Sequence, residues 1–144
     1  MFKKLSLFLL LITLLGACSQ QNDKESQIET TNLNLEVVEN VLKGQGFELG
    51  EAPELPSENV FIQKLNGVAP DLYSVEGNLL SVYEFPSASA RGKGIEKFEE
   101  KTATADLVEH QVYGVNNILV FYVSADEKVQ SELHEALQKL DTPD

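Results

Sequence analysis

Residues 107–124 read LVEHQVYGVNNILVFYVS, two apolar runs that flank Asn116 and Asn117. Asparagine tolerates the positive φ values that a two-residue hairpin turn requires. We therefore predict a β-hairpin with strands over 107–115 and 118–124. Alternation about the turn gives two apolar faces. They are formed by Val112, Leu119, Phe121 and Val123 on one side and by Tyr113, Val115, Ile118, Val120 and Tyr122 on the other.

A hairpin that is apolar on both faces has two interpretations, since a sheet packed on one side needs only one apolar face. In the first, the hairpin is central and covered on both sides, with the first helix over one of them. In the second, one face is an exposed patch that contacts a partner, because contiguous apolar patches mark interaction sites. The candidate contact residues are then Tyr113, Val120 and Tyr122, with Tyr83 from a neighbouring strand.

An earlier pair of strands has the same alternating character. The runs 72–75 and 79–85 flank a Gly-Asn pair at 77–78, which suits a tight turn. Pairing across that turn places Val75 opposite Leu80. We therefore predict a second hairpin.

Three segments show the apolar spacing of amphipathic helices. The first begins after Asn34, which is a suitable cap, and ends at Gly44. The second covers 88–101. The third follows residues 124–127, which have the spacing of a capping box, and ends near Asp141.

The region between the first helix and the first hairpin completes the pattern. Residues 48–57 form an irregular acidic connection with two prolines, and Asn59–Leu65 (NVFIQKL) has the character of a strand. The predicted order of elements is α-β-β-β-α-β-β-α. Hairpins separated by single helices favour an α+β fold with an antiparallel sheet of about five strands and helices packed mainly on one face.

The beginning of the chain has a different composition. Lys3 and Lys4 precede the apolar stretch 5–15, in which Ser6 and Thr13 are the polar members. A basic start, a short apolar run and small residues after it are typical of a secretory signal. The run is shorter than the roughly 20 apolar residues that a membrane-spanning helix needs.

At Leu15-Gly16-Ala17-Cys18 the chain resembles bacterial lipoprotein precursors, whose lipobox is Leu, a small residue, Gly or Ala, then Cys. The resemblance implies cleavage before Cys18 and a diacylglycerol on its thiol. It also implies a lipid anchor on the extracytoplasmic face of the cell membrane. The alternatives are an uncleaved signal anchor and an ordinary cleaved signal. Cys18 is the only cysteine, so no disulfide forms within the chain.

Cleavage divides the chain into a signal peptide (1–17), a lipidated polar tether (18–33) and a single domain (34–144). Because two lysines leave with the signal, 9 of the 11 basic residues remain against 23 acidic ones, a formal charge of −14. An acidic domain of this kind is repelled by phosphates, so we exclude nucleic acid as a partner.

Residues suited to catalysis are scattered. His110 and His134 lie in no metal-ligand spacing, and no serine stands in a nucleophile motif. We therefore predict no enzymatic activity, cofactor or metal. Arg91 and Gly92, near the start of the second helix, are candidates for an anion site. The alternative is that Gly92 lets this helix approach the sheet, which leaves Gly94 unexplained.

The expected function is that of a non-enzymatic lipoprotein that binds another envelope protein or a second copy of itself. The alternative is a carrier or sensor of a small ligand, held between the sheet and the connection 48–57. That alternative predicts a closed apolar pocket with a few polar groups.

Overall fold

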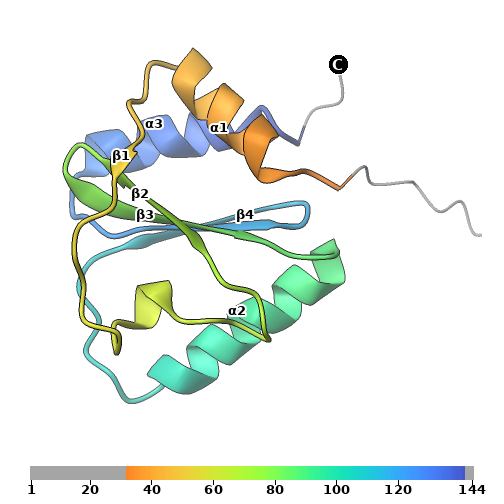
Figure 1. Cartoon of the computed structure of the whole chain (residues 1–144), viewed down its shortest axis with the longest axis vertical. Helices are drawn as coiled ribbons and strands as arrows, with labels where there is room; N and C mark the ends of the chain where they lie inside the picture. The colour runs from red at the N-terminus through yellow and green to blue at the C-terminus, as the bar shows by residue number, and fades with distance from the viewer. Residues whose placement is uncertain (1–31, 142–144) are drawn as a thin grey trace, which may run out of the picture.

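The structure is a computed structural model that describes residues 32–141 (Figure 1). The predicted signal peptide, Cys18 and the tether up to residue 31 lie outside the described residues. Five antiparallel strands form one sheet in the order β1-β2-β3-β5-β4, accompanied by three α-helices. The predicted α+β class with a five-stranded antiparallel sheet is therefore confirmed.

The strands are β1 (Gly50–Glu51), β2 (Asp71–Val75), β3 (Asn78–Glu84), β4 (Gln111–Val115) and β5 (Ile118–Tyr122). The α-helices are α1 (Leu35–Gly44), α2 (Ala88–Thr102) and α3 (Glu127–Gln138). Each helix has a side-chain cap, in which Asn34, Ser87 and Asp126 accept hydrogen bonds from amides of the first turn. Asp126 caps α3, rather than the Ser124 that capping-box spacing indicated.

The hairpin of β4 and β5 has the predicted turn. Asn116 has a φ of 51°, and Val115 pairs with Ile118 on the other side of the turn. The hairpin of β2 and β3 turns at Glu76 and Gly77 instead of at 77–78, because these two residues adopt φ values of 50° and 77°. The shift changes each cross-strand partner by two residues, so that Val75 pairs with Asn78 and not with Leu80. Since the side-chain period is two, the predicted faces are unchanged.

The predicted strand 59–65 is wrong. Its central residues form a short 3-10 helix, Val60–Ile62, capped by the side chain of Asn59. Phe61 points into the core and is buried. A short apolar run fits a strand or a buried helical turn equally well by its pattern alone. The remaining strand comes instead from the predicted irregular connection, where Gly50 and Glu51 pair with β2.

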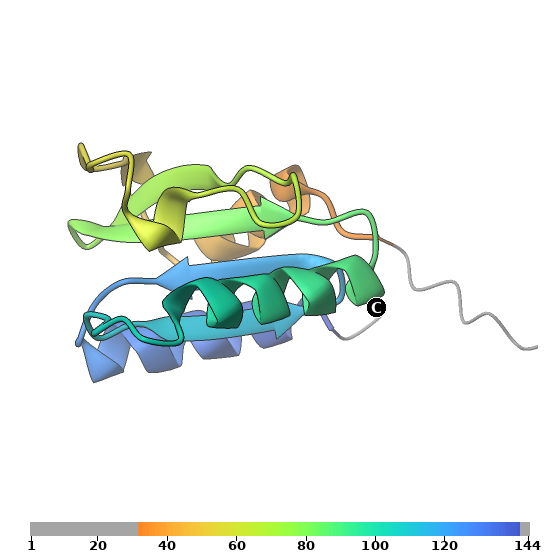
Figure 2. The ribbon, with the colours of Figure 1, turned by 90° about the horizontal axis from the view of Figure 1, so that it is seen from below.

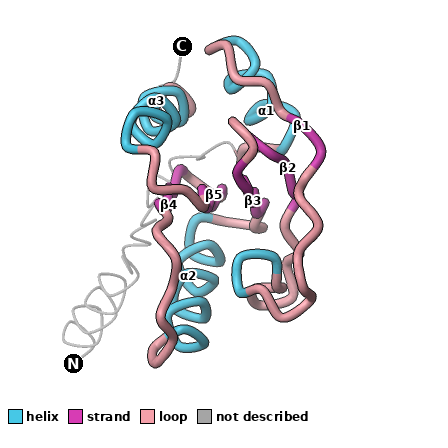
Figure 3. The backbone as a smooth tube through the Cα atoms, turned by 90° about the vertical axis from the view of Figure 1, so that its left-hand side faces the viewer, coloured by secondary structure: helices cyan, strands magenta, loops and turns pink. Residues whose placement is uncertain are grey.

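Helices cover both faces of the sheet (Figure 1). In Figure 3, α1 and α3 lie on one side of the strands and α2 on the other, and Figure 2 shows α2 running along the sheet. Two of the three helices thus share a face. The apolar core has two matching parts, one under α1 and α3 with Leu42, Leu80 and Leu133, and one under α2 with Phe98 and Phe121.

The start of the domain is fixed to the end of the sheet. Asn117, which is buried, accepts a hydrogen bond from the Leu33 amide at 2.7 Å and donates to the Leu33 carbonyl at 2.8 Å. The side chain of Asn32 donates to the Pro86 carbonyl at 2.7 Å. The folded domain therefore includes Asn32 and Leu33, which the sequence assigned to the tether.

Candidate functional site

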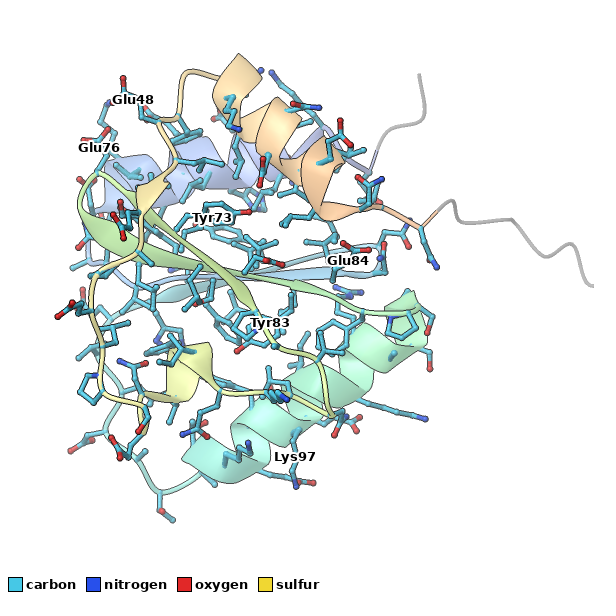
Figure 4. The ribbon with its side chains drawn as sticks, in the orientation of Figure 1. Glu48, Tyr73, Glu76, Tyr83, Glu84 and Lys97 are labelled. Atoms are coloured by element: carbon cyan, nitrogen blue, oxygen red, sulfur yellow. The ribbon has the colours of Figure 1, made fainter. Side chains whose placement is uncertain are left out.

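The predicted patch residues lie inside the domain. Tyr113 is 7% exposed, Val120 1%, and Tyr122 and Tyr83 are fully buried. Figure 4 shows Tyr83 between the sheet and α2, on the opposite side from Tyr73. The prediction of an exposed patch at these residues is wrong, because α1 and α3 cover one face and α2 the other. The first interpretation, a hairpin covered on both sides, describes the structure.

The buried tyrosines use their hydroxyl groups to hold other elements against the sheet. Tyr113 donates a hydrogen bond to the carbonyl of Gln130 in α3 at 2.8 Å. Tyr83 donates to the carbonyl of Gln63 at 2.7 Å. Burial raises the pKa of Tyr113 to about 12, so its hydroxyl remains a donor at neutral pH. These residues therefore stabilise the fold rather than contact a partner.

The same hairpin nevertheless has an open side, which is the outer edge of β4. Within residues 32–141, β4 is the last strand of the sheet and pairs with β5 alone. The amide of Phe85 donates to the Asn117 carbonyl, and the amide of Val123 donates to the Leu79 carbonyl. Odd-numbered residues of the β5 segment therefore direct their backbone groups toward β3.

Antiparallel strands alternate the direction of their backbone groups. The even-numbered residues of β5 consequently bond to β4, where their partners are Gln111, Tyr113 and Val115. Val112 and Gly114, the two residues in between, direct their N–H and C=O groups away from β5. The edge of β4 thus presents two amides and two carbonyls that point away from β5. They are spaced so that an added strand can form hydrogen bonds with them.

The side chains around this edge leave it accessible. Val112 is 41% exposed and Gly114 has no side chain. The strand has the sequence QVYGV, without a charged residue or a proline. Open hollows of about 390 and 200 Å³ run between β4 and α3, lined in part by Gln111, Gln130 and His134. An added strand has room for its side chains on this face.

The other face of the edge carries Arg91. Its guanidinium lies over Gly114, with Cζ at 3.1 Å from the place that a β-carbon on residue 114 would take. The Arg91 amide already donates to the Ser87 carbonyl within α2. Arg91 and Gly92, the predicted residues of an anion site, therefore do not form such a site at the N-terminus of α2. The Arg91 side chain extends to β4 instead.

The glycines of α2 have roles opposite to those expected. A β-carbon on Gly92 would meet nothing within 4 Å, so close packing does not require glycine there. A β-carbon on Gly94 would instead collide with the ring of Phe85. Gly94 is thus the residue that allows α2 to approach the sheet.

Both histidines have structural neighbours. His110 packs its ring on Phe61 with centroids 4.8 Å apart, and its Nδ1 lies 2.8 Å from the Val108 carbonyl oxygen. His134 lies on α3 beside Tyr113 and within hydrogen-bond distance of Gln138. Residues 32–141 contain no cluster of histidine, cysteine and carboxylate side chains placed to hold a metal ion.

A further hollow of about 500 Å³ lies at the end of the sheet near the N-terminus of α3. It is open and lined by charged residues, among them Lys128 and Glu132, which form an ion pair at 2.8 Å. The carrier alternative predicted a closed apolar pocket beside the connection 48–57. In the structure Leu49 and Leu55 of that connection pack on the core instead.

No protein-family model, curated protein or solved structure matches this chain. No helix between residues 32 and 141 has the length and apolar character needed to cross a membrane. The edge of β4 is the site that we consider functional. Sequence periodicity did not indicate it, because periodicity does not give the order of strands in a sheet.

Proposed function

We propose that this protein is a non-enzymatic lipoprotein, anchored by a lipid on Cys18 to the extracytoplasmic face of the cell membrane. Its domain binds an extended segment of another envelope protein, which adds to the sheet as a sixth strand beside β4. The lipobox 15–18 supports the anchor, and the acidic composition makes nucleic acid an unsuitable partner.

The observation that carries the proposed binding mode is the outward direction of the Val112 and Gly114 backbone groups. Main-chain hydrogen bonds to such an edge supply affinity, and side-chain sites on the two faces supply specificity. The hollows beside α3 and the guanidinium of Arg91 provide one such site on each face.

The start of the described domain is compatible with this use of β4. The contacts of Asn32 and Leu33 with Pro86 and Asn117 fix the start of the domain at one end of the strands. Asn32, the first described residue, therefore lies at an end of the strands.

The test is a selection of random short peptides on the purified protein in detergent micelles, followed by amide hydrogen exchange of the complexes. We expect the selected peptides to slow exchange at Val112 and Gly114, whose amides bond to no residue in the described part of the chain. Exchange at Gly50 and Glu51, on the opposite edge, should not change. A selection that yields no binder, or binders that protect other amides, overturns the proposal.

A further inference from the structure

We infer that the segment bound at β4 carries a carboxylate side chain that pairs with Arg91. The inference rests on the proposed function and names the chemistry of the partner. It is argued from the charge of Arg91, its position over Gly114 and the geometry of an added strand.

Arg91 is the only arginine of the chain, in which 23 acidic residues face 11 basic ones. Within residues 32–141, the ion pairs involve Lys43, Lys97 and Lys128 and leave Arg91 without an acidic partner. Its Nε is buried and has no hydrogen-bond acceptor there. A half-buried guanidinium in so acidic a domain is thus left unpaired beside the open edge.

Gly114 is what allows the guanidinium to occupy this position. Any β-carbon at residue 114 would collide with Nη1 of Arg91. Gly114 pairs with Leu119, whose side chain belongs to the core under α2. Arg91 therefore covers the α2 face of β4 directly beside the outward backbone groups of Gly114.

An added antiparallel strand places one residue opposite Gly114, with its side chain on the same face. Directly paired residues have β-carbons about 4.5–5.5 Å apart, so that side chain is delivered to the guanidinium. A planar guanidinium is best satisfied by a carboxylate, which accepts two parallel N–H···O bonds. The residue opposite Gly114 is therefore an aspartate or glutamate.

A second copy of the chain does not supply this group. In antiparallel pairing of two β4 edges, outward-facing residues pair with one another, which places His110, Val112 or Gly114 of the copy opposite Gly114. None of them is acidic, and two domains of the same negative charge repel each other. The β4 edge of a second copy is therefore unsuited to this site, and the occupant that we propose is a segment of a different protein.

The experiment extends the peptide selection to three forms of the protein: the wild type, Arg91→Gln and Lys97→Gln. Lys97 lies on the same helix and pairs with Glu100 at 3.1 Å. Lys97→Gln therefore removes one positive charge, as Arg91→Gln does, but at a position away from the edge of β4. We expect peptides selected on the wild type and on Lys97→Gln to share an acidic position. Selection on Arg91→Gln should lose this preference.

Individual peptides then test the pairing directly. Changing the shared acidic residue to its amide should weaken binding to the wild type about tenfold, as expected for a charged pair worth about 1.4 kcal/mol. The same change should have no effect on Arg91→Gln. Gly114→Ala displaces the guanidinium but keeps its charge. In this variant, changing the acidic residue to its amide should therefore weaken binding less than it does in the wild type.

The outcomes separate the two proposals. The inference is overturned, and the proposed function still stands, if the peptides protect Val112 and Gly114 but share no acidic position. The same holds if changing the acidic residue to its amide weakens binding to Arg91→Gln as much as binding to the wild type. A selection in which no peptide protects these amides overturns the proposed function, and the inference with it.

Discussion

The two edges of the sheet differ in the length of their strands and in the charged residues and prolines that these strands contain or precede. β1 has two residues, Gly50 and Glu51, and is followed by Pro53 and Glu54. β4 at the opposite edge has five residues, none of them charged or proline. Natural proteins protect sheet edges with short strands, charges and prolines, since a bare edge pairs with other chains.

β1 is short, ends with a charged residue and is followed by a proline. β4 is longer and contains neither a charged residue nor a proline. A bare edge is a liability for a soluble domain unless it serves a purpose. The absence of protection at β4, set against its presence at β1 of the same sheet, is therefore the strongest argument that β4 is the binding edge.

The largest expected effect comes from proline substitutions along β4. Val115 donates its amide to β5 through its pair with Ile118, whereas the amide of Val112 points outward. Proline removes an amide donor and is tolerated only where that donor faces away from the sheet. We expect Val115→Pro to lower the free energy of unfolding by about 1–3 kcal/mol more than Val112→Pro, the cost of an unsatisfied buried partner.

Urea unfolding of the two variants measures this difference, and equal slopes of free energy against urea would show that both unfold the same structure. The two substitutions are matched, because both replace a valine in the same strand. Equal losses of stability would mean that the backbone of Val112 is not free, and β4 would then not be an open edge.

A smaller effect is expected from a charge placed on the open edge. Val112→Glu gives β4 a charge of the kind that protects other edge strands, on the face where the acidic residue of the bound segment is proposed to lie. Because Val112 is 41% exposed, the substitution should leave the fold intact. Binding of a peptide selected on the wild type should weaken about tenfold, which corresponds to about 1.4 kcal/mol.

Glu51→Gln on β1 is the matched control, since it changes the charge by one unit on the opposite edge. Its affinity for the peptide should equal that of the wild type, as measured by fluorescence anisotropy of a labelled peptide. A loss of affinity in Glu51→Gln, or none in Val112→Glu, would assign the binding site to a different part of the surface.

The contrast between the edges also explains how much the sequence predicted. The hairpin of β4 and β5 was predictable because its turn and its alternation are local properties of a short stretch. β1 was not, since two residues near prolines have no detectable period. The run 59–65 was misassigned because an apolar segment also satisfies a buried helical turn such as the one that contains Phe61.

The site was less accessible to sequence reasoning than the fold. Periodicity predicted the two faces of the hairpin correctly but left open whether both of them are covered. The free edge depends on the order of the strands, and β4 lies outside β5 only because β5 pairs with β3. Arg91 was singled out as a candidate cation, yet its position over Gly114 is a tertiary contact that no local pattern contains.

The smallest expected effect concerns two tyrosines that hold helices on the same face of the sheet, one toward each edge. Tyr73, the partner of Glu51 in β1, donates a hydrogen bond to Oε1 of Glu39 in α1 at 2.6 Å. Tyr113 in β4 donates to a backbone carbonyl of α3. Only the first of these acceptors titrates. The hydrogen bond from Tyr73, assisted by Lys43, lowers the pKa of Glu39.

A carboxyl whose pKa is lowered by folding stabilises the protein above its unfolded pKa, which is about 4.3 for glutamate. That contribution is lost as the pH falls through the lower pKa of the folded state. We expect Tyr73→Phe to remove this part of the acid dependence of stability, an effect of less than about 1 kcal/mol for a partly exposed acid near the surface. Tyr113→Phe should lower stability by about 1 kcal/mol and leave the acid dependence unchanged. Urea midpoints between neutral and acidic pH measure both effects. An acid dependence of stability in Tyr73→Phe as large as that of the wild type would show that the hydrogen bond from Tyr73 to Glu39 does not contribute to it.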